Sequence, residues 1–317
     1  MNILITGCAG FIGFNISQYL GKTNNIIGVD NLNSYYSRKL KLDRLKELKK
    51  NKRFKFYKID ISKKKDFEKI FKKQKIHVVI NLAAQAGVRY SIENPDAYTR
   101  SNLIGFSVIL ELSRKYKVKH LLAASTSSVY GDNKSKILTE NLNTNNPIQY
   151  YAATKKSNEV MGHSYSSMFN MKITMLRFFT VYGPWGRPDM ALFKFTKNIL
   201  ENKPIDVYNY GNHMRGFTYV ETISHVINKM IKFKRSKNYE IYNIGGSESI
   251  KLMDFIKIIE NKLEKKAKLK FLKLQPGDIV STNAGLNKIN KYLTNYKQVG
   301  IKQGISNFVD WYKSYYQ

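Results

Sequence analysis

Two side chains of this 317-residue chain could exchange a proton with a hydroxyl group: a tyrosine and a lysine four positions apart. Tyr151 and Lys155 fall in a predicted helix over 147–169, so they share one face and can meet one ligand. An ammonium group near a phenol stabilises the phenolate, and we expect it to lower the pKa of Tyr151 toward neutrality. With 22 Tyr and 44 Lys, such pairs also arise by chance. The pair needs support from its surroundings.

A cluster of hydroxyl groups supplies some of that support. Thr126, Ser127 and Ser128 follow a predicted buried strand over 120–125 and precede Gly131. Such hydroxyls at the carboxyl end of a strand can form hydrogen bonds with a sugar. Ser and Thr in this position also commonly make turns, so both interpretations stay open at this point.

A glycine loop predicts a nucleotide site at the start of the chain. Gly7, Gly10 and Gly13 follow a short apolar strand, 2–6, and precede an amphipathic helix. The three glycines allow a tight turn, a close approach to a pyrophosphate and close packing of helix on strand. Asp30 ends the next strand 20 residues after Gly10, where an acid can bind the ribose hydroxyls of NAD and would repel the 2′-phosphate of NADP.

Two further polar segments follow predicted strands. Asp60 ends one strand, and Asn81–Gln85 follows another. Ligands of open parallel sheets bind at these carboxyl ends. Either segment could instead simply cap a turn.

The elements that must position these residues alternate between strands and helices through the first half of the chain. Short apolar strands separated by helical patterns predict a parallel sheet with right-handed crossovers, an α/β doubly wound (Rossmann) fold. The predicted strands are 2–6, 26–30, 54–59, 78–83, 120–125 and 172–178. The predicted helices are 11–20, 37–50, 65–73, 95–115 and 147–169.

After residue 179 the pattern changes. A segment punctuated by glycine and proline, 183–188, precedes helices near 190–202, 220–233 and 252–263 and a turn at 275–278. We therefore predict a smaller C-terminal α/β substrate-binding domain, made of 179–217 and 245–317. Residues 1–178, with about 218–244, form the cofactor-binding domain.

Composition limits the remaining classes. The only cysteine, Cys8, excludes an intrachain disulfide and a cysteine-rich zinc site, so we predict no metal and a reducing, cytoplasmic setting. The net charge of +31 comes from lysines scattered among asparagines, which is typical of solvated faces, and we expect no nucleic-acid partner. Every apolar run is shorter than a membrane span, so no stable membrane association is expected.

Taken together, the glycine loop, Tyr151 with Lys155, and Ser125–Gly131 resemble extended short-chain dehydrogenases/reductases that modify nucleotide sugars. The similarity runs from Ile3 to about Asp278. Longer stretches resemble UDP-glucuronate 4-epimerases in particular, and these are 30–36, 84–91 and 177–190. The resemblance implies tightly bound NAD, a UDP-sugar substrate and a homodimer formed through helices near 95–115 and 147–169.

The residues after the catalytic threonine distinguish close relatives. Nucleotide-sugar 4,6-dehydratases carry an Asp-Glu pair there, and UDP-glucuronate decarboxylases carry Glu at the second position. This chain has Ser127 and Ser128. Elimination would lack its acid/base pair, whereas oxidation and reduction at C4 of the sugar need only Tyr151, Lys155, Thr126 and NAD.

The mechanism implied by the resemblance is epimerisation through a 4-keto sugar. Tyr151 takes the C4 hydroxyl proton, Thr126 orients that oxygen, and the hydride passes to NAD and returns to the opposite face. The intermediate from UDP-glucuronate is a β-keto acid that can lose its carboxylate. Arg187, with Thr180, Ser127 and Ser128, is expected to hold this group.

The same resemblance assigns the other site residues. Arg215 is expected at the diphosphate, Asp278 near the uridine ribose and Arg89 in the same pocket. Gly216, Glu221 and Thr222 depart from the family pattern around Arg215. The residues expected to bind NAD are Gly7, Gly10, Phe11, Ile12, Gly13, Asp30, Asn31, Asn33, Asp60, Ile61, Leu82, Ala83, Ala84, Tyr151, Lys155 and Phe178.

Three alternatives remain open from the sequence. One is a UDP-glucose/UDP-galactose-type 4-epimerase, and another is a UDP-glucuronate decarboxylase. The third is a basic NAD-sensing or nucleic-acid-binding protein built on an inactive dehydrogenase fold, against which the intact Tyr151, Lys155 and Thr126 argue.

Overall fold

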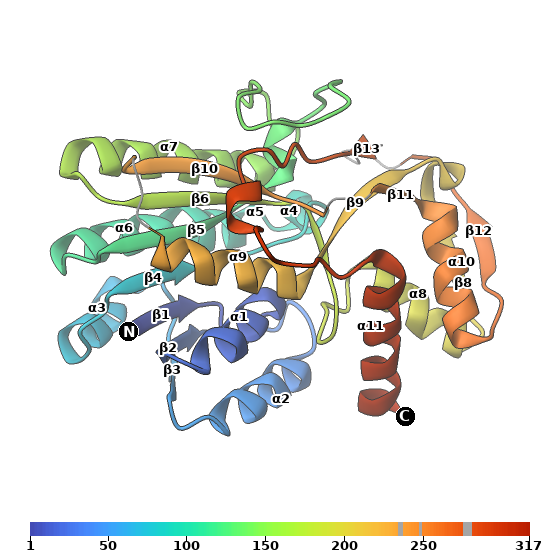
Figure 1. The fold of residues 1–317 in the computed structure, drawn as a ribbon, viewed down its shortest axis with the longest axis horizontal. Helices are drawn as coiled ribbons and strands as arrows, with labels where there is room; N and C mark the ends of the chain where they lie inside the picture. Colours follow the sequence, from blue (N-terminus) through green and yellow to red (C-terminus); the bar gives the residue numbers. More distant parts are fainter. Residues whose placement is uncertain (234–236, 247–248, 275–280) are drawn as a thin grey trace.

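A seven-stranded parallel sheet forms the larger part of the molecule (Figure 1). The computed structural model describes residues 1–233, 237–246, 249–274 and 281–317. The strand order is β10-β6-β5-β4-β1-β2-β3, so the order reverses beside β1 as in a doubly wound fold. The strands are β1 (Asn2–Thr6), β2 (Asn25–Asp30), β3 (Phe54–Lys58), β4 (Val78–Asn81), β5 (His120–Thr126), β6 (Ile173–Phe178) and β10 (Tyr239–Ile244).

Helices cover both faces of this sheet, which explains why its strands are almost continuously apolar. On β1, Ile3 and Ile5 enter one core while Leu4 enters the other. The first core receives α1 (Phe11–Gly21), α2 (Arg38–Lys49) and α9 (Val220–Lys232). The second receives α3 (Lys64–Lys73), α6 (Gly105–Lys115) and part of α7 (Tyr150–Phe169).

The predicted sheet is confirmed, and two predicted helices differ in detail. The segment 95–115 is not one α-helix, because α5 (Pro95–Tyr98) leads into a π-helical turn, η1 (Thr99–Ile104), before α6. A short helix, α4 (Tyr90–Glu93), precedes them. Helix α7 begins at Tyr150 rather than at 147, since Gln149 is extended and forms its N-cap. The missed π-turn matters for the site, because such turns place side chains that a regular helix would rotate away.

A second lobe lies to one side of this sheet, on the right in Figure 1. It has its own core, to which Phe193, Phe255 and Phe308 contribute from three helices. Its described elements are β7 (Thr180–Tyr182), α8 (Ala191–Leu200), β8 (Pro204–Val207), η3 (Tyr208–Gly211), β9 (Met214–Tyr219), β11 (Ser249–Lys251), α10 (Leu252–Leu263), β12 (Lys268–Phe271), β13 (Ser281–Thr282) and α11 (Ile301–Tyr316).

The boundary between the lobes does not follow the sequence cleanly. Ile289 and Tyr292, at the short helix η4 (Asn290–Tyr292), pack into the core of the first lobe. Ala284 forms an isolated bridge with Leu138. The division at residue 245 therefore stays a prediction, with 289–292 contacting the cofactor lobe. Within the described ranges, no helix combines the length and the apolar character needed to cross a bilayer.

Candidate active site

The glycine loop connects β1 to α1 at the carboxyl edge of the sheet. Gly7 adopts φ +71°, and a Cβ built on Gly13 would lie 2.1 Å from the Gly7 carbonyl oxygen, so only glycine fits there. Among the described residues no side chain caps α1, and its first turn contains no acid. The free amide groups of this turn and the helix dipole make it a site for an anion.

Asp30 lies against this loop. Its carboxylate accepts hydrogen bonds from the amides of Ala9, at 3.2 Å, and Leu32, at 2.8 Å. Burial raises the pKa of Asp30, and these amides together with the charge of Lys41 limit the rise. The Lys41 ammonium donates to the Asn33 side-chain oxygen at 2.6 Å. The predicted residues Asp30 and Asn33 are thus held in place by the chain itself.

A hollow of about 530 Å³ opens beside the ends of β2 and β3. Asn31 and Asp60 line it, and the Asn31 amide donates to Asp60 at 3.4 Å. Burial alone would raise the pKa of Asp60, but hydrogen bonds from Ser62 and Asn31 lower it. A hollow of this size can receive one end of a dinucleotide.

The segment after β4 closes the cofactor side. The amides of Leu82 and Ala83 donate to the Thr6 hydroxyl at 3.2 and 3.1 Å, which fixes this segment against the glycine loop. Ile61 is buried, and Phe178 ends β6 with 8% of its surface exposed. The structure therefore brings the predicted cofactor residues to one edge of the sheet.

Tyr151 lies on the first turn of α7, with its side chain facing the end of β5. Burial raises the pKa of Tyr151, while the positive charge of Arg187 and a hydrogen bond with Thr126 lower it without cancelling the rise. The predicted lowering of the Tyr151 pKa toward neutrality is therefore wrong for the protein alone. Removing a phenolate from water costs more than the positive charge of Arg187 returns.

Lys155 is nearly inaccessible, with 2% of its surface exposed. Burial lowers the pKa of its ammonium to about 8, and the negative charge of Glu159, one turn further along α7, acts in the opposite direction. Lys155 can therefore change its charge near physiological pH. A neighbouring anion is needed to keep it protonated.

A buried ion pair that was not predicted from the sequence lies behind the catalytic residues. Glu159 accepts hydrogen bonds from Arg177 on β6, both at 2.8 Å, and from the Ser125 hydroxyl on β5 at 2.6 Å. Arg177 also donates to the Tyr130 hydroxyl at 3.0 Å. Thr126 follows Ser125 in the chain and Phe178 follows Arg177, and both Thr126 and Phe178 belong to the predicted site. The pair thus ties α7 to both strands directly under it.

Asn102 is a second unassigned residue, and it lies in the π-turn. Its side chain accepts from the Gln85 amide at 2.8 Å and donates to the Gln85 carbonyl at 3.1 Å and the Thr154 hydroxyl at 3.0 Å. The segment after β4 is thereby joined to α7. The spacing of Tyr151, Lys155 and Glu159 could have identified Glu159, and a lone arginine in an apolar strand could have identified Arg177. No sequence signal marks Asn102.

Arg187 is paired with an acid two residues away. Its guanidinium binds the Asp189 carboxylate through two nitrogens, with the Nε–Oδ1 distance 3.0 Å. The Tyr35 hydroxyl also donates to Asp189, at 3.3 Å. Burial would lower the pKa of Arg187, but Asp189 raises it, and the ion pair in turn lowers the pKa of Asp189 despite its burial.

An aromatic wall connects this pair to the catalytic tyrosine. The ring centroids of Tyr151 and Tyr98 are 6.0 Å apart. The ring of Tyr90 lies next, with its centroid 6.2 Å from that of Tyr98 and 5.0 Å from that of Tyr35. Arg187 in turn lies over the ring of Tyr35. Residues far apart in sequence thus pack in a continuous row that ends at Tyr151.

The other predicted substrate residues come from separate elements. Ser127 and Ser128 begin a 3₁₀ turn, η2 (Ser127–Tyr130), that the Thr126 hydroxyl caps by accepting from the Ser128 amide at 3.2 Å. Thr180 begins β7. Arg89 lies over the ring of Tyr208 in the second lobe, at 4.9 Å, and Arg215 lies on β9. Asp278 falls outside the described residues.

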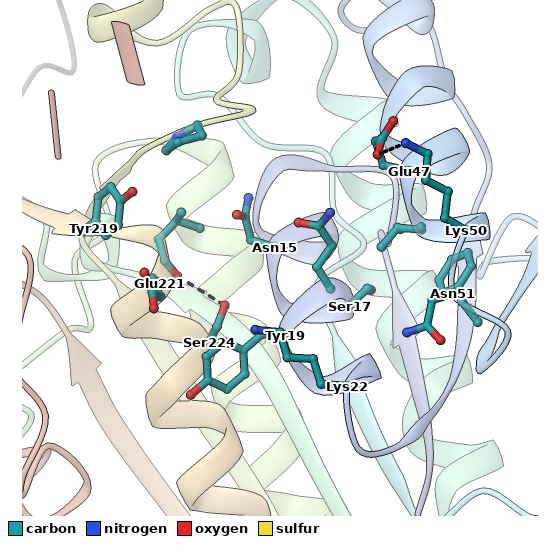
Figure 2. Close-up of a pocket in the computed structure, with 15 residues that line it drawn as sticks. Asn15, Ser17, Tyr19, Lys22, Glu47, Lys50, Asn51, Tyr219, Glu221 and Ser224 are labelled. Atoms are coloured by element: carbon teal, nitrogen blue, oxygen red, sulfur yellow. Dashed lines mark hydrogen bonds and ion pairs between the residues drawn. The ribbon is translucent and has the colours of Figure 1, made fainter. Parts of the chain in front are cut away.

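A larger hollow, about 640 Å³, is not part of this site. Figure 2 shows it between α1, α2 and α9, with the ion pair of Glu47 and Lys50 at one side and Glu221 at the other. None of the described site residues predicted from the sequence lines it. Its lining is largely polar and includes the ion pair of Glu47 and Lys50.

The fold and the site together define a class of protein. The sheet is doubly wound, a glycine loop follows β1, and an acid ends β2. A tyrosine and a lysine lie on one helix beside a threonine. These features define the class of dinucleotide-dependent dehydrogenases and reductases of the short-chain type. The NAD dependent epimerase/dehydratase family matches residues 3–245. The chain belongs to this family, and NAD is its cofactor.

Individual relatives match this chain over nearly their whole lengths. Protein CapI of Staphylococcus aureus is 48% identical, with all of both chains covered. UDP-glucuronate 4-epimerase of Thermodesulfobacterium geofontis is 42% identical over 98% of this chain and 95% of the relative. The crystal structure of UDP-glucuronic acid 4-epimerase from Bacillus cereus, in complex with UDP-glucuronic acid and NAD, has a TM-score of 0.94 and 35% identity over all of both chains.

Proposed function

We propose that this protein is an NAD-dependent UDP-glucuronate 4-epimerase, an isomerase that interconverts UDP-glucuronate and UDP-galacturonate. The observation that carries the proposal is the placement of Arg187 over the ring of Tyr35, at the end of the aromatic wall that begins at Tyr151, where its charge also lowers the pKa of that phenol. A guanidinium placed there can bind the carboxylate of an acidic sugar while the tyrosine acts on its C4 hydroxyl. The names of the relatives support the same substrate.

The cofactor fits the residues present. The uncapped start of α1 takes the pyrophosphate, Asp30 the ribose hydroxyls, and the hollow beside Asn31 and Asp60 the adenosine end. NAD, when bound, supplies the acceptor and donor of hydride at C4 of the sugar. Side chains at positions 7 and 13 would collide with backbone atoms of Ala83 and Gly7, so the loop can keep this conformation only with glycine there.

The chain's own residues move the proton. Tyr151 takes the proton of the C4 hydroxyl and later returns it, and Thr126 holds the same oxygen through its hydroxyl. The raised pKa of Tyr151 means that the free protein keeps the phenol protonated. Positive charge must therefore be added or drawn closer before the phenolate forms, and Lys155, held protonated by Glu159, is the group on the same helix face that can supply it.

Arg187, Thr180, Ser127 and Ser128 hold the sugar carboxylate. The sugar carboxylate competes with Asp189 for the Arg187 guanidinium. Two of the three guanidinium nitrogens donate to Asp189, and the third is left for the sugar. With serines after Thr126, no carboxylate at those two positions is available to eliminate water. This favours reduction of the keto sugar over the reactions of dehydratases and decarboxylases.

The test is to incubate the purified protein with UDP-glucuronate, without added NAD. Formation of UDP-galacturonate at unchanged mass, without carbon dioxide, is expected. A pentose product with released carbon dioxide would assign the decarboxylase instead. Turnover of UDP-glucose with none of UDP-glucuronate would assign a neutral-sugar epimerase.

We also propose that the protein is a homodimer formed through α6 and α7. Three apolar side chains of α7 are exposed, namely Val160 (58%), Met168 (61%) and, at the end of the helix, Phe169 (43%). A two-fold axis would place this patch against its own copy and cover both. Val160→Asp with Met168→Asp should convert a dimer to a monomer in analytical ultracentrifugation, and a wild-type monomer at micromolar concentration would refute the proposal.

A further inference from the structure

Arg44 is a fully buried arginine with no carboxylate partner among the described residues. It lies on α2, and none of its surface is exposed. One guanidinium nitrogen donates to the Ala9 carbonyl at 2.9 Å and the Tyr36 hydroxyl at 2.7 Å. The other donates to the carbonyls of Trp185 at 2.5 Å and Gly186 at 3.1 Å. Burying a charge in this way is costly unless its hydrogen bonds are well placed.

One end of this network is the cofactor loop. Ala9 lies between Gly7 and Gly10, and its amide donates to Asp30 while its carbonyl accepts from Arg44. Both sides of the Ala9 residue are therefore fixed by charged side chains. Movement of Arg44 would release the loop that receives the pyrophosphate.

The other end is the loop before Arg187. Trp185 has φ +62°, a left-handed conformation that costs a non-glycine residue about 1–3 kcal/mol. Arg44 holds its carbonyl, and its ring packs against Phe14 at 5.1 Å and Trp311 at 5.4 Å. Such a conformation persists only where the surroundings enforce it. Arg187 follows two residues later, so its position depends on the same contacts.

We propose that Arg44 is a positioning residue that locks the loop carrying Arg187 to the cofactor loop and thereby decides whether the keto sugar keeps its carboxylate. This inference rests on the proposed function. In the reaction to be prevented, the C5–C6 bond breaks, C6 leaves as carbon dioxide, and the bond's electron pair forms an enolate with the C4 carbonyl, which then takes a proton at C5. That cleavage requires the C5–C6 bond to align with the ketone, and a guanidinium fixed by Arg44 holds the carboxylate away from alignment.

The experiment measures carbon dioxide released per UDP-galacturonate formed, from UDP-glucuronate labelled at C6, together with bound NAD per chain. Arg44→Lys keeps the charge but cannot reach all four acceptors. Loss of a hydrogen bond to a charged group changes a partition about tenfold. We expect the carbon dioxide share to rise about tenfold and bound NAD to fall. Tyr36→Phe removes one acceptor at little risk to folding and should raise the share less, in the same direction.

Arg53→Lys is the matched control, because Arg53 is exposed and, within the part of the chain that the structure describes, its guanidinium donates to the Lys22 carbonyl alone. It should leave both readouts unchanged. The product ratio does not depend on how much enzyme is folded, so a residue that only stabilises the fold would not change it. An unchanged ratio in Arg44→Lys, or in Tyr36→Phe if the arginine variant does not fold, would overturn the proposal. If the wild type does not convert UDP-glucuronate, the proposed function fails first.

Discussion

The cofactor side and the substrate side of the site are built differently. On the cofactor side, the important groups are backbone amides and glycines. They lie in loops that directly follow β1, β2 and β4. On the substrate side, the important groups are side chains, and Tyr35, Tyr151 and Arg187 come from three separate parts of the chain. The first arrangement depends on local geometry, whereas the second depends on how distant segments pack.

This difference teaches where each side can tolerate change. A backbone site is sensitive to added atoms and insensitive to charge, while a side-chain site is sensitive to the loss of a single functional group. Tyr151, Lys155 and Glu159 lie between the two, on one face of α7.

The largest effect is expected from Tyr151→Phe. Loss of the group that carries the C4 proton should lower kcat by about 10²–10⁴-fold. Bound NAD per chain should stay at the wild-type value, since the ring remains. Steady-state kinetics with UDP-glucuronate, and absorbance of the released cofactor, measure the two quantities. Tyr150→Phe, on the adjacent exposed tyrosine, is the control. Retention of activity would remove Tyr151 from catalysis.

Glu159→Gln should cost about 3–5 kcal/mol of unfolding free energy, because it leaves Arg177 buried without its counter-ion. Chemical denaturation of the NAD-loaded protein measures this loss. Glu111→Gln breaks a surface pair with Arg114 and should change little. Equal effects of the two variants would mean that the buried pair has no special role at the junction of α7, β5 and β6.

Gly13→Ala tests the backbone side alone. Its Cβ would lie 2.1 Å from the Gly7 carbonyl oxygen, so the loop must move, at a cost of about 3 kcal/mol. Bound NAD should be lost and the melting temperature should fall. Gly300→Ala is the matched control, because its Cβ meets nothing within 4 Å. NAD retention in Gly13→Ala would contradict a tight backbone cradle.

The pH dependence of stability tests Lys155. Burial lowers the pKa of Lys155 from 10.5 to about 8, so the unfolded chain holds this proton more tightly than the folded protein. The buried ammonium therefore lowers the free energy of unfolding by its full amount, at most about 3 kcal/mol, below about pH 8. This destabilisation disappears as the pH rises toward 10.5. The stability of Lys155→Met relative to wild type should be highest near pH 7 and decline toward pH 10. A difference independent of pH would show that the folded pKa is normal.

Arg187→Leu tests the side-chain side alone and has the smallest expected effect. Loss of a charge-assisted contact should raise KM for UDP-glucuronate about 10–100-fold. Bound NAD should be unchanged, and turnover of UDP-glucose should not fall. Arg187→Lys should recover part of the affinity. A loss of NAD in Arg187→Leu would break the separation between the two sides.

The sequence by itself determined the doubly wound fold, the glycine loop, Asp30 and the Tyr151–Lys155 pair. Each follows from local periodicity or from a short motif, and local rules are readable along the chain. The site edge was predictable for the same reason, because the carboxyl ends of parallel strands meet there. The break in 95–115 was missed because a π-turn leaves no composition signal.

Only the tertiary structure decided the rest. The buried pair of Glu159 and Arg177, the contact of Asp189 with Arg187 and the four bonds of Arg44 join residues between two and 142 positions apart. Arg44 is one basic residue in a helix rich in lysine, and nothing in its type or spacing marks it. The raised pKa of Tyr151 likewise reverses the expectation from spacing. Burial and long-range charge are properties of the packed molecule, so they could be read only after the chain was folded.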